Sequence, residues 1–116
     1  MRHHVTIKKL GRERKVRSSL MRSLAEGLIL RGKIKTTETK AKALRPYVEK
    51  LVTIAKKNTV TARRLIISRL GTEKRAAKLV DDIAPKYKDR NGGYTRVIKL
   101  PARAGDASPM AFIEFV

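Results

Sequence analysis

The chain has no cysteine, and aromatic residues make up only 4% of its 116 residues. Without cysteine it can form no disulfide, no thiolate metal site and no cysteine nucleophile. The low aromatic content argues against a surface that stacks many bases of a single nucleic-acid strand. No apolar run approaches the roughly 20 residues that a membrane-spanning helix requires, so we expect no membrane partner. The first nine residues also lack the apolar core of a secretory signal.

Acidic residues are scarce, and this scarcity is the strongest functional signal in the chain. Ten Asp and Glu residues stand against 29 Lys and Arg residues, which gives a formal net charge of +19. Like charges repel one another in a compact state, so such a surface is typical of a protein that faces a polyanion. Nucleic acid is the polyanion whose condensed counterions are released on binding, so the composition predicts an RNA or DNA partner.

The sequence offers little from which an active site could be built. Asp81 and Asp82 are adjacent, and successive helix residues point about 100° apart, so we expect salt bridges to neighbouring cations instead of a shared acid site. No glycine-rich phosphate loop is followed by Lys and Ser or Thr. His3 and His4 have no nearby carboxylate or thiolate and are predicted to stack on or hydrogen-bond to RNA, not to bind metal. No enzyme activity, cofactor or small-molecule substrate is expected.

Residues 1–16 are predicted to form a basic, extended N-terminal arm, followed by a single domain over residues 17–116. Val5, Ile7 and Leu10 are too few for a packed face, and Gly11 interrupts a helix. Such an arm can neutralise phosphates and enter between RNA helices where a folded domain cannot.

Apolar periodicity predicts four helices in the remainder. The first runs from about Val16 to Arg31, with a stripe at every fourth residue and Gly32 as C-cap. The second starts at Thr36 or Thr37 and contains Pro46, which predicts a kink or two abutting helices. Its buried face is predicted to consist of Ala41, Leu44, Val48, Leu51, Val52 and Ala55. The third helix begins at Thr59 or Thr61, and its inward residues are predicted to be Leu65, Ile66 and Leu70. A fourth helix follows Thr72, and Pro85 limits its end.

Three strands complete the predicted fold. Residues 33–36 form a short strand, and residues 94–100 and 110–116 alternate as a hairpin joined by the loop 101–109. The element order predicts an α+β fold in which the helices pack on one face of a small mixed sheet.

The stretch from Arg90 to Arg96 allows two compatible interpretations. It is a turn that enters a strand, or Gly92 and Gly93 let the backbone approach a phosphate, with Arg90 and Arg96 beside it.

Several separate stretches, in order, resemble the bacterial ribosomal large-subunit protein seventeen family. The N-terminal ones are Met1-Arg2-His3, Leu10-Gly11-Arg12 and Arg22-Ser23-Leu24-Ala25. The central ones are Ile34-Lys35-Thr36-Thr37, Lys40-Ala41-Lys42 and Leu44-Arg45. Gly92-Gly93-Tyr94-Thr95-Arg96 and the run from Arg103 to Ala111 resemble the C-terminal signatures. The resemblance covers essentially the whole length.

This resemblance implies a cytoplasmic, structural constituent of the large ribosomal subunit. It implies binding to large-subunit rRNA near the polypeptide exit tunnel, beside neighbouring large-subunit proteins. On this basis the arm and first helix are expected to neutralise phosphates, through Arg2, Lys8, Lys9, Arg12, Arg14, Lys15, Arg17 and Arg22. The same surface is extended by Lys33, Lys35, Lys40 and Arg45. A second contact at the sheet end is predicted for Arg90, Gly92, Gly93, Tyr94, Arg96 and Arg103.

Two alternatives remain open from the sequence. The short Gly71-Thr72 turn between the third and fourth helices resembles a helix-turn-helix, which favours a DNA-binding nucleoid or regulatory protein. A small RNA-processing enzyme is the other alternative, although no catalytic constellation is evident.

Overall fold

A computed structural model describes residues 13–116 of the chain. The chain forms α1 (Arg14–Arg31), β1 (Lys33–Thr37), α2 (Glu38–Ala55), α3 (Val60–Leu70) and α4 (Glu73–Lys78). A π-helical turn η1 (Leu79–Ile83), a 3-10 turn η2 (Ala84–Tyr87) and the strands β2 (Thr95–Leu100) and β3 (Met110–Phe115) follow. The predicted α+β fold and its element order are confirmed.

The sheet has the strand order β1-β3-β2, and β3 pairs antiparallel with both neighbours. The prediction of a mixed sheet is therefore wrong. Because β1 and β2 lie on opposite sides of β3, these two strands never pair and no parallel ladder forms.

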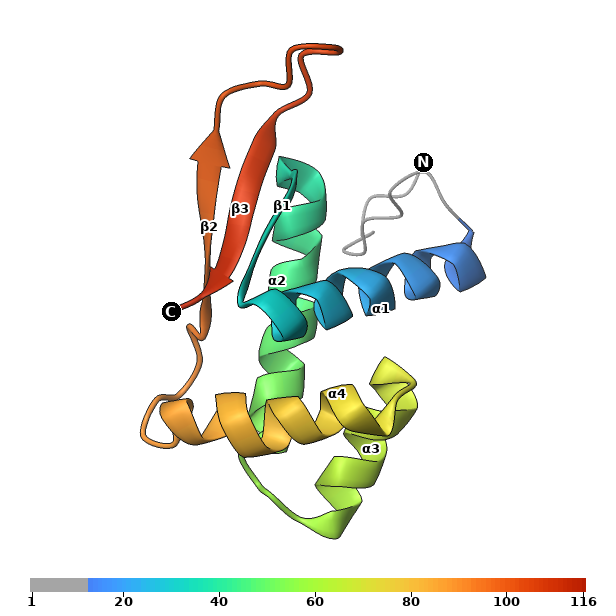
Figure 1. The fold of residues 1–116 in the computed structure, drawn as a ribbon, viewed down its shortest axis with the longest axis vertical. Helices are drawn as coiled ribbons and strands as arrows, with labels where there is room; N and C mark the ends of the chain where they lie inside the picture. The colour runs from blue at the N-terminus through green and yellow to red at the C-terminus, as the bar shows by residue number, and fades with distance from the viewer. Residues whose placement is uncertain (1–12) are drawn as a thin grey trace, which may run out of the picture.

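Alternation along the strands gives the sheet an inner and an outer face. Ile34 opposes Ile113 and Thr36 opposes Ala111, and these four side chains are buried. Their neighbours Lys33, Lys35 and Phe112 point to the other face, because successive strand residues alternate. The helix α2 lies along the inner face of the sheet, and α1 crosses α2 (Figure 1). The helices α3 and α4 lie near the C-terminal end of α2.

The central helix α2 is continuous through Pro46. Thr37 caps it by accepting a hydrogen bond from the Lys40 amide at 3.4 Å, as predicted. The expectation of two abutting helices is therefore wrong. Pro46 has no amide proton to donate to the Lys42 carbonyl, but both residues are exposed, so water can bind that carbonyl and the helix continues. The predicted buried face is confirmed and consists of Ala41, Leu44, Val48, Leu51, Val52 and Ala55.

The first helix begins at Arg14, two residues before the predicted start, so Arg14 and Lys15 are helical and not part of an extended arm. Gly32 adopts the left-handed conformation with φ of 79° and donates to the Leu28 carbonyl, which confirms the predicted C-cap. Val16 is 52% exposed, because the N-terminal half of α1 extends beyond the helices that cover its C-terminal half (Figure 1). The division of the chain into an arm and one domain stays a prediction.

The third and fourth helices differ from expectation in two details. Leu65 was predicted to point inward but is 39% exposed, because the buried line of α3 follows the i, i+4 spacing of Ala62, Ile66 and Leu70. Pro85 does not end the fourth helical segment. The Ala84 amide instead donates to the Leu79 carbonyl five residues back, and the chain continues as the 3-10 turn η2.

No helix within residues 13–116 is long and apolar enough to cross a lipid bilayer.

Leu28 and Leu30 on α1 provide a matched test of the core. Leu28 is completely buried, whereas Leu30 is 50% exposed. We expect Leu28→Ala to lower the free energy of unfolding by about 2–5 kcal/mol, because it leaves a cavity. The control Leu30→Ala is expected to change it by less than about 0.5 kcal/mol. Urea denaturation followed by circular dichroism measures both, and equal losses would contradict the packing described here.

Candidate nucleic-acid interface

Carboxylates neutralise part of the basic surface. Glu114 pairs with Arg96 at 2.8 Å and lies 3.9 Å from Lys33. Glu49 pairs with Arg45 at 3.2 Å, and Asp106 pairs with Arg103 at 2.7 Å. Lys33, Arg45, Arg96 and Arg103, four of the residues predicted to bind RNA, are therefore already ion-paired. Exposed pairs of this kind are worth only about 0–1 kcal/mol, so a phosphate can compete with the carboxylate.

The predicted salt bridge of Asp81 is confirmed, since Arg63 Nη2 lies 2.9 Å from Asp81 Oδ1. The adjacent Asp82 is also exposed. Within residues 13–116, no third His, Asp or Glu side chain joins the two aspartates to form a possible metal site.

Arg22 supports the fold as well as the surface charge. Its Nε donates to the Arg69 carbonyl at 3.1 Å, at the C-terminal end of α3. Lys78 acts in the same way on α1, donating from Nζ to the Leu30 carbonyl at 2.9 Å. Cations at these positions satisfy carbonyls that have no helical donor and lie at the negative ends of the helix dipoles. Arg22 thus holds α1 against α3.

The Gly92-Gly93 turn binds a carboxylate of its own chain. Both glycines have positive φ, 84° and 63°, which explains their presence in the turn. The Gly93 amide donates to Glu49 Oε1 at 3.2 Å, and Thr95 Oγ1 donates to Glu49 Oε2 at 2.9 Å. The Gly93 amide therefore already has a carboxylate partner in the folded chain, and its approach to a phosphate stays a prediction.

Tyr94 is a core residue, so its predicted contact with RNA is wrong. It is only 1% exposed, and its ring centroid lies 5.3 Å from that of Tyr87. Its hydroxyl accepts a hydrogen bond from Lys56 Nζ at 3.1 Å. A hydrogen bond with the Gly92 backbone, assisted by Lys56, lowers the pKa of Tyr94 below its ordinary value. The aromatic pair fixes the turn against the C-terminal end of α2.

The predicted second contact at the sheet end does not form one cluster. Arg96 lies at the start of β2, whereas Arg103 lies in the loop beyond its other end. Arg90 Nη1 donates to the Gly93 carbonyl at 3.4 Å and stays with the turn before β2. A whole strand therefore separates Arg103 from Arg90 and Arg96.

A second group of cations has no carboxylate partner within residues 13–116. The members predicted from the sequence are Arg14, Lys15, Arg17, Arg22, Lys35, Lys40 and Arg90, of which Arg22 and Arg90 donate to backbone carbonyls. Arg14, Lys15 and Arg17 lie on the part of α1 that extends from the body, and Lys35 and Lys40 lie on β1 and the first turn of α2 (Figure 1). The remaining predicted residues, Arg2, His3, His4, Lys8, Lys9 and Arg12, lie outside the described part of the chain.

Sequence reasoning missed further exposed cations without a carboxylate partner in the described range. Most lie on the polar faces or at the ends of the helices, where a helical-wheel reading could have found them. They are Arg31, Lys50, Lys57, Arg64, Arg69, Lys74, Lys86 and Lys88.

The arrangement of α4 does not suit a recognition helix. Arg75 Nε lies 3.7 Å from Glu26 of α1, and Lys78 binds the Leu30 carbonyl of the same helix. Its apolar residue Ala76 and the following Leu79 and Val80 are buried. Two of the basic side chains that could enter a DNA groove are thus held against α1.

Comparison with known proteins identifies the family of the chain. The model of a family described as ribosomal protein L17 matches residues 20–116. The chain belongs to the ribosomal protein L17 family. Large ribosomal subunit protein bL17 of Persephonella marina is 57% identical over 118 residues, covering all of this chain and 95% of the relative. The protein of the same name from Sphingopyxis alaskensis is 53% identical over 116 residues, covering all of this chain and 84% of the relative.

Family membership confirms the resemblance read from the sequence and gives the protein a structural role in the ribosome, in the cytoplasm. The fold of the chain also accounts for the matched stretches. Thr37 and Lys40 form the cap of α2, Gly92 and Gly93 form the turn on Glu49, and Arg103 to Ser108 form the hairpin loop.

The loop bond between Arg103 and Asp106 gives a pH prediction. Two hydrogen bonds from the Arg103 guanidinium, with further bonds from Ser108, hold the pKa of Asp106 well below its usual range. Because the folded pKa is lowered, the bonds persist at neutral pH and are lost only as the pH falls through that lowered value. We expect Arg103→Ala to raise the pKa of Asp106 toward its ordinary value.

Carbon-13 NMR titration of the Asp106 carboxyl measures this shift. Arg96→Ala, which removes an exposed arginine paired with a different carboxylate, serves as the control and should leave the Asp106 titration unchanged. An unaltered Asp106 titration in Arg103→Ala would contradict the loop geometry.

Proposed function

We propose that this protein is a structural, non-catalytic component of the large ribosomal subunit that binds and stabilises large-subunit rRNA, beside other large-subunit proteins and near the polypeptide exit tunnel. The observation that carries the rRNA contact is the group of cations without a carboxylate partner at the start of α1. The names of the relatives, which are proteins of the large ribosomal subunit, support the assembly partner.

The start of α1 is suited to a phosphate contact by its shape and its charge. Arg14 and Arg17 are three residues apart and share one helix face, and Lys15 lies about 100° around the axis. A helix fixes the spacing of these side chains, so they can neutralise neighbouring phosphates with little further ordering. Phosphate contacts of this kind set the position of a protein on RNA without reading its sequence.

The basic residues before α1 add to the same contact. The basic residues that precede α1 in the sequence are Arg2, Lys8, Lys9 and Arg12. Together with α1 and β1 they belong to residues 1–36, which hold 11 basic and two acidic residues. Low aromatic content and a rigid, basic surface fit structured RNA recognised by shape and backbone. The family is one of structural ribosomal components, which is consistent with a role that needs no catalysis.

Sedimentation tests the assembly partner directly. Cells are lysed in magnesium buffer, the lysate is separated on a sucrose gradient, and the protein is quantified after a high-salt wash. We expect stoichiometric recovery with the large subunit. Recovery at the top of the gradient, or with chromosomal DNA, would contradict the proposal.

Salt dependence tests the start of α1. The affinity of the wild-type protein for transcribed large-subunit rRNA is measured at several salt concentrations. We expect the triple variant Arg14→Ala, Lys15→Ala, Arg17→Ala to bind more weakly. Its slope of log K against log salt should fall by about 2–3, because each lost phosphate contact contributes about 0.7–0.9.

The matched control removes the same charge from ion-paired positions. Lys42, Arg63 and Lys99 each have a carboxylate partner and none is predicted to contact RNA, so Lys42→Ala, Arg63→Ala, Lys99→Ala should keep nearly the wild-type slope. Equal flattening in both triple variants would show that only bulk charge matters and that the start of α1 is not the contact.

A further inference from the structure

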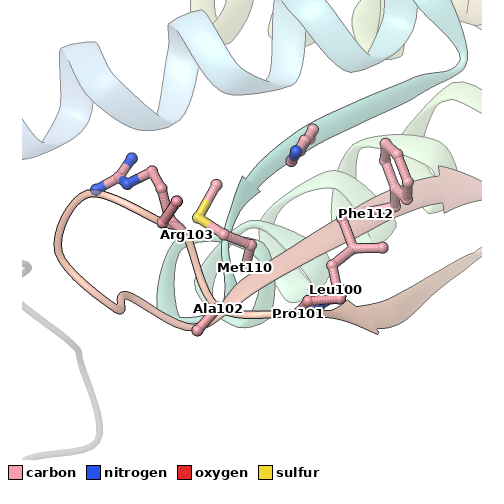
Figure 2. A pocket seen from close by; sticks show the side chains of 8 residues that line it. Leu100, Pro101, Ala102, Arg103, Met110 and Phe112 are labelled. Atoms are coloured by element: carbon pink, nitrogen blue, oxygen red, sulfur yellow. The ribbon is translucent and has the colours of Figure 1, made fainter.

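The sheet face that α2 leaves uncovered carries a groove where the loop 101–109 joins β2 and β3. Its volume is about 390 Å³, and Leu100, Pro101, Met110 and Phe112 contribute apolar walls. Arg103 lies toward one end and Phe112 toward the other in Figure 2, with Met110 between them. The cations at the start of α1 do not line this groove.

Phe112 presents part of its ring to the groove. Strand pairing sets Phe112 between Lys35 and Ile98 on the outer face, where Ile98 is 40% exposed. Lys33 Nζ lies 4.1 Å from the centroid of the Phe112 ring, but Lys33 is not part of the groove wall. The ring therefore meets a cation on one side and the open groove on another.

The charges around the groove are positive. Lys35 contributes to the wall and has no carboxylate partner within residues 13–116. Arg103 also contributes, and its exposed guanidinium is held in place by Asp106 through bonds of 3.0 and 2.7 Å. A flat aromatic ring that carries a phosphate matches this combination, because the ring fills the apolar slot and the phosphate meets the cations. An uncharged apolar peptide would leave Lys35 without an anionic partner and would add no anion beside Arg103.

We propose that this groove binds one unpaired nucleotide of RNA, with its base stacked on Phe112 and its phosphate bound by Lys35 and Arg103. This inference rests on the proposed rRNA-binding function and adds to it a specific contact with a base. A single stacking position is compatible with the low aromatic content, which argues only against a surface that stacks many bases.

Binding of a short RNA by the full-length protein tests the stacking. The probe is a ten-nucleotide single-stranded RNA that contains the fluorescent base 2-aminopurine, compared with the same strand in a duplex. We expect Phe112→Leu to weaken single-strand binding on the order of 10-fold and to abolish the quenching of 2-aminopurine. Duplex binding should stay within about two-fold of wild type, because paired bases cannot enter the groove.

Two further variants separate stacking from general damage to the sheet. Phe112→Tyr keeps an aromatic ring and should retain wild-type binding and quenching. Ile98→Ala removes an exposed aliphatic side chain beside Phe112 and should also leave both unchanged. Weakening by Ile98→Ala equal to that by Phe112→Leu, or wild-type binding in Phe112→Leu, would overturn the proposal.

Ultraviolet crosslinking of intact large subunits, followed by mass spectrometry, tests the same contact in the assembled particle. We expect a nucleotide attached at Phe112 in wild-type subunits and none at this position in Phe112→Leu subunits. Subunits that contain the protein but show no nucleotide there, or a protein segment crosslinked to Phe112, would overturn the groove assignment alone. Absence of the protein from the subunits would instead contradict the proposed function.

Discussion

The buried face of α2 is the contact on which the rest of the structure depends. Its six buried residues pack against all three strands on one side and against α1, α3 and η1 on others. Burying a side chain such as Leu44 or Leu51 stabilises the fold by about 1.5–3 kcal/mol. A chain with a net charge of +19 needs this apolar centre, because its surface charges repel one another in the folded state. The helix therefore has two roles, joining the sheet to the helical layer and opposing the repulsion.

Several acidic residues pair with cations near the sheet and leave the cations at the start of α1 without a carboxylate partner within residues 13–116. Glu49 binds the Gly93 amide, Thr95 and Arg45 at once, and Glu114 lies between Lys33 and Arg96. These carboxylates concentrate near the sheet, where basic residues come from several strands and helices. The start of α1 has no such ion pairs within residues 13–116. The start of α1 therefore retains unneutralised charge, whereas several cations near the sheet are ion-paired.

Much of the fold could be predicted from the sequence, because its helices carry regular apolar stripes and its turns carry glycine. The cap at Thr37, the C-cap at Gly32 and the buried residues of α2 followed from local patterns alone. Tertiary contacts were less accessible. The exposure of Leu65 depends on which face of α3 meets its neighbours. The role of Gly93 depends on Glu49, which is 44 residues away in the chain. Charge counting predicted a nucleic-acid partner, but it could not separate cations paired with carboxylates from cations without such a partner.

The strand order has a consequence for the way the chain reaches this state. β1 ends at Thr37 and can pair only with β3, which begins at Met110. Because a nascent chain emerges with its N-terminal part first, β1 must wait for the whole helical segment and the hairpin to be synthesised before it finds a partner. Closing so long a loop makes this pairing entropically demanding and slow compared with helix formation. Until then β1 is an unpaired strand with lysines at alternate positions, and these charges oppose its pairing with the same strand of another copy.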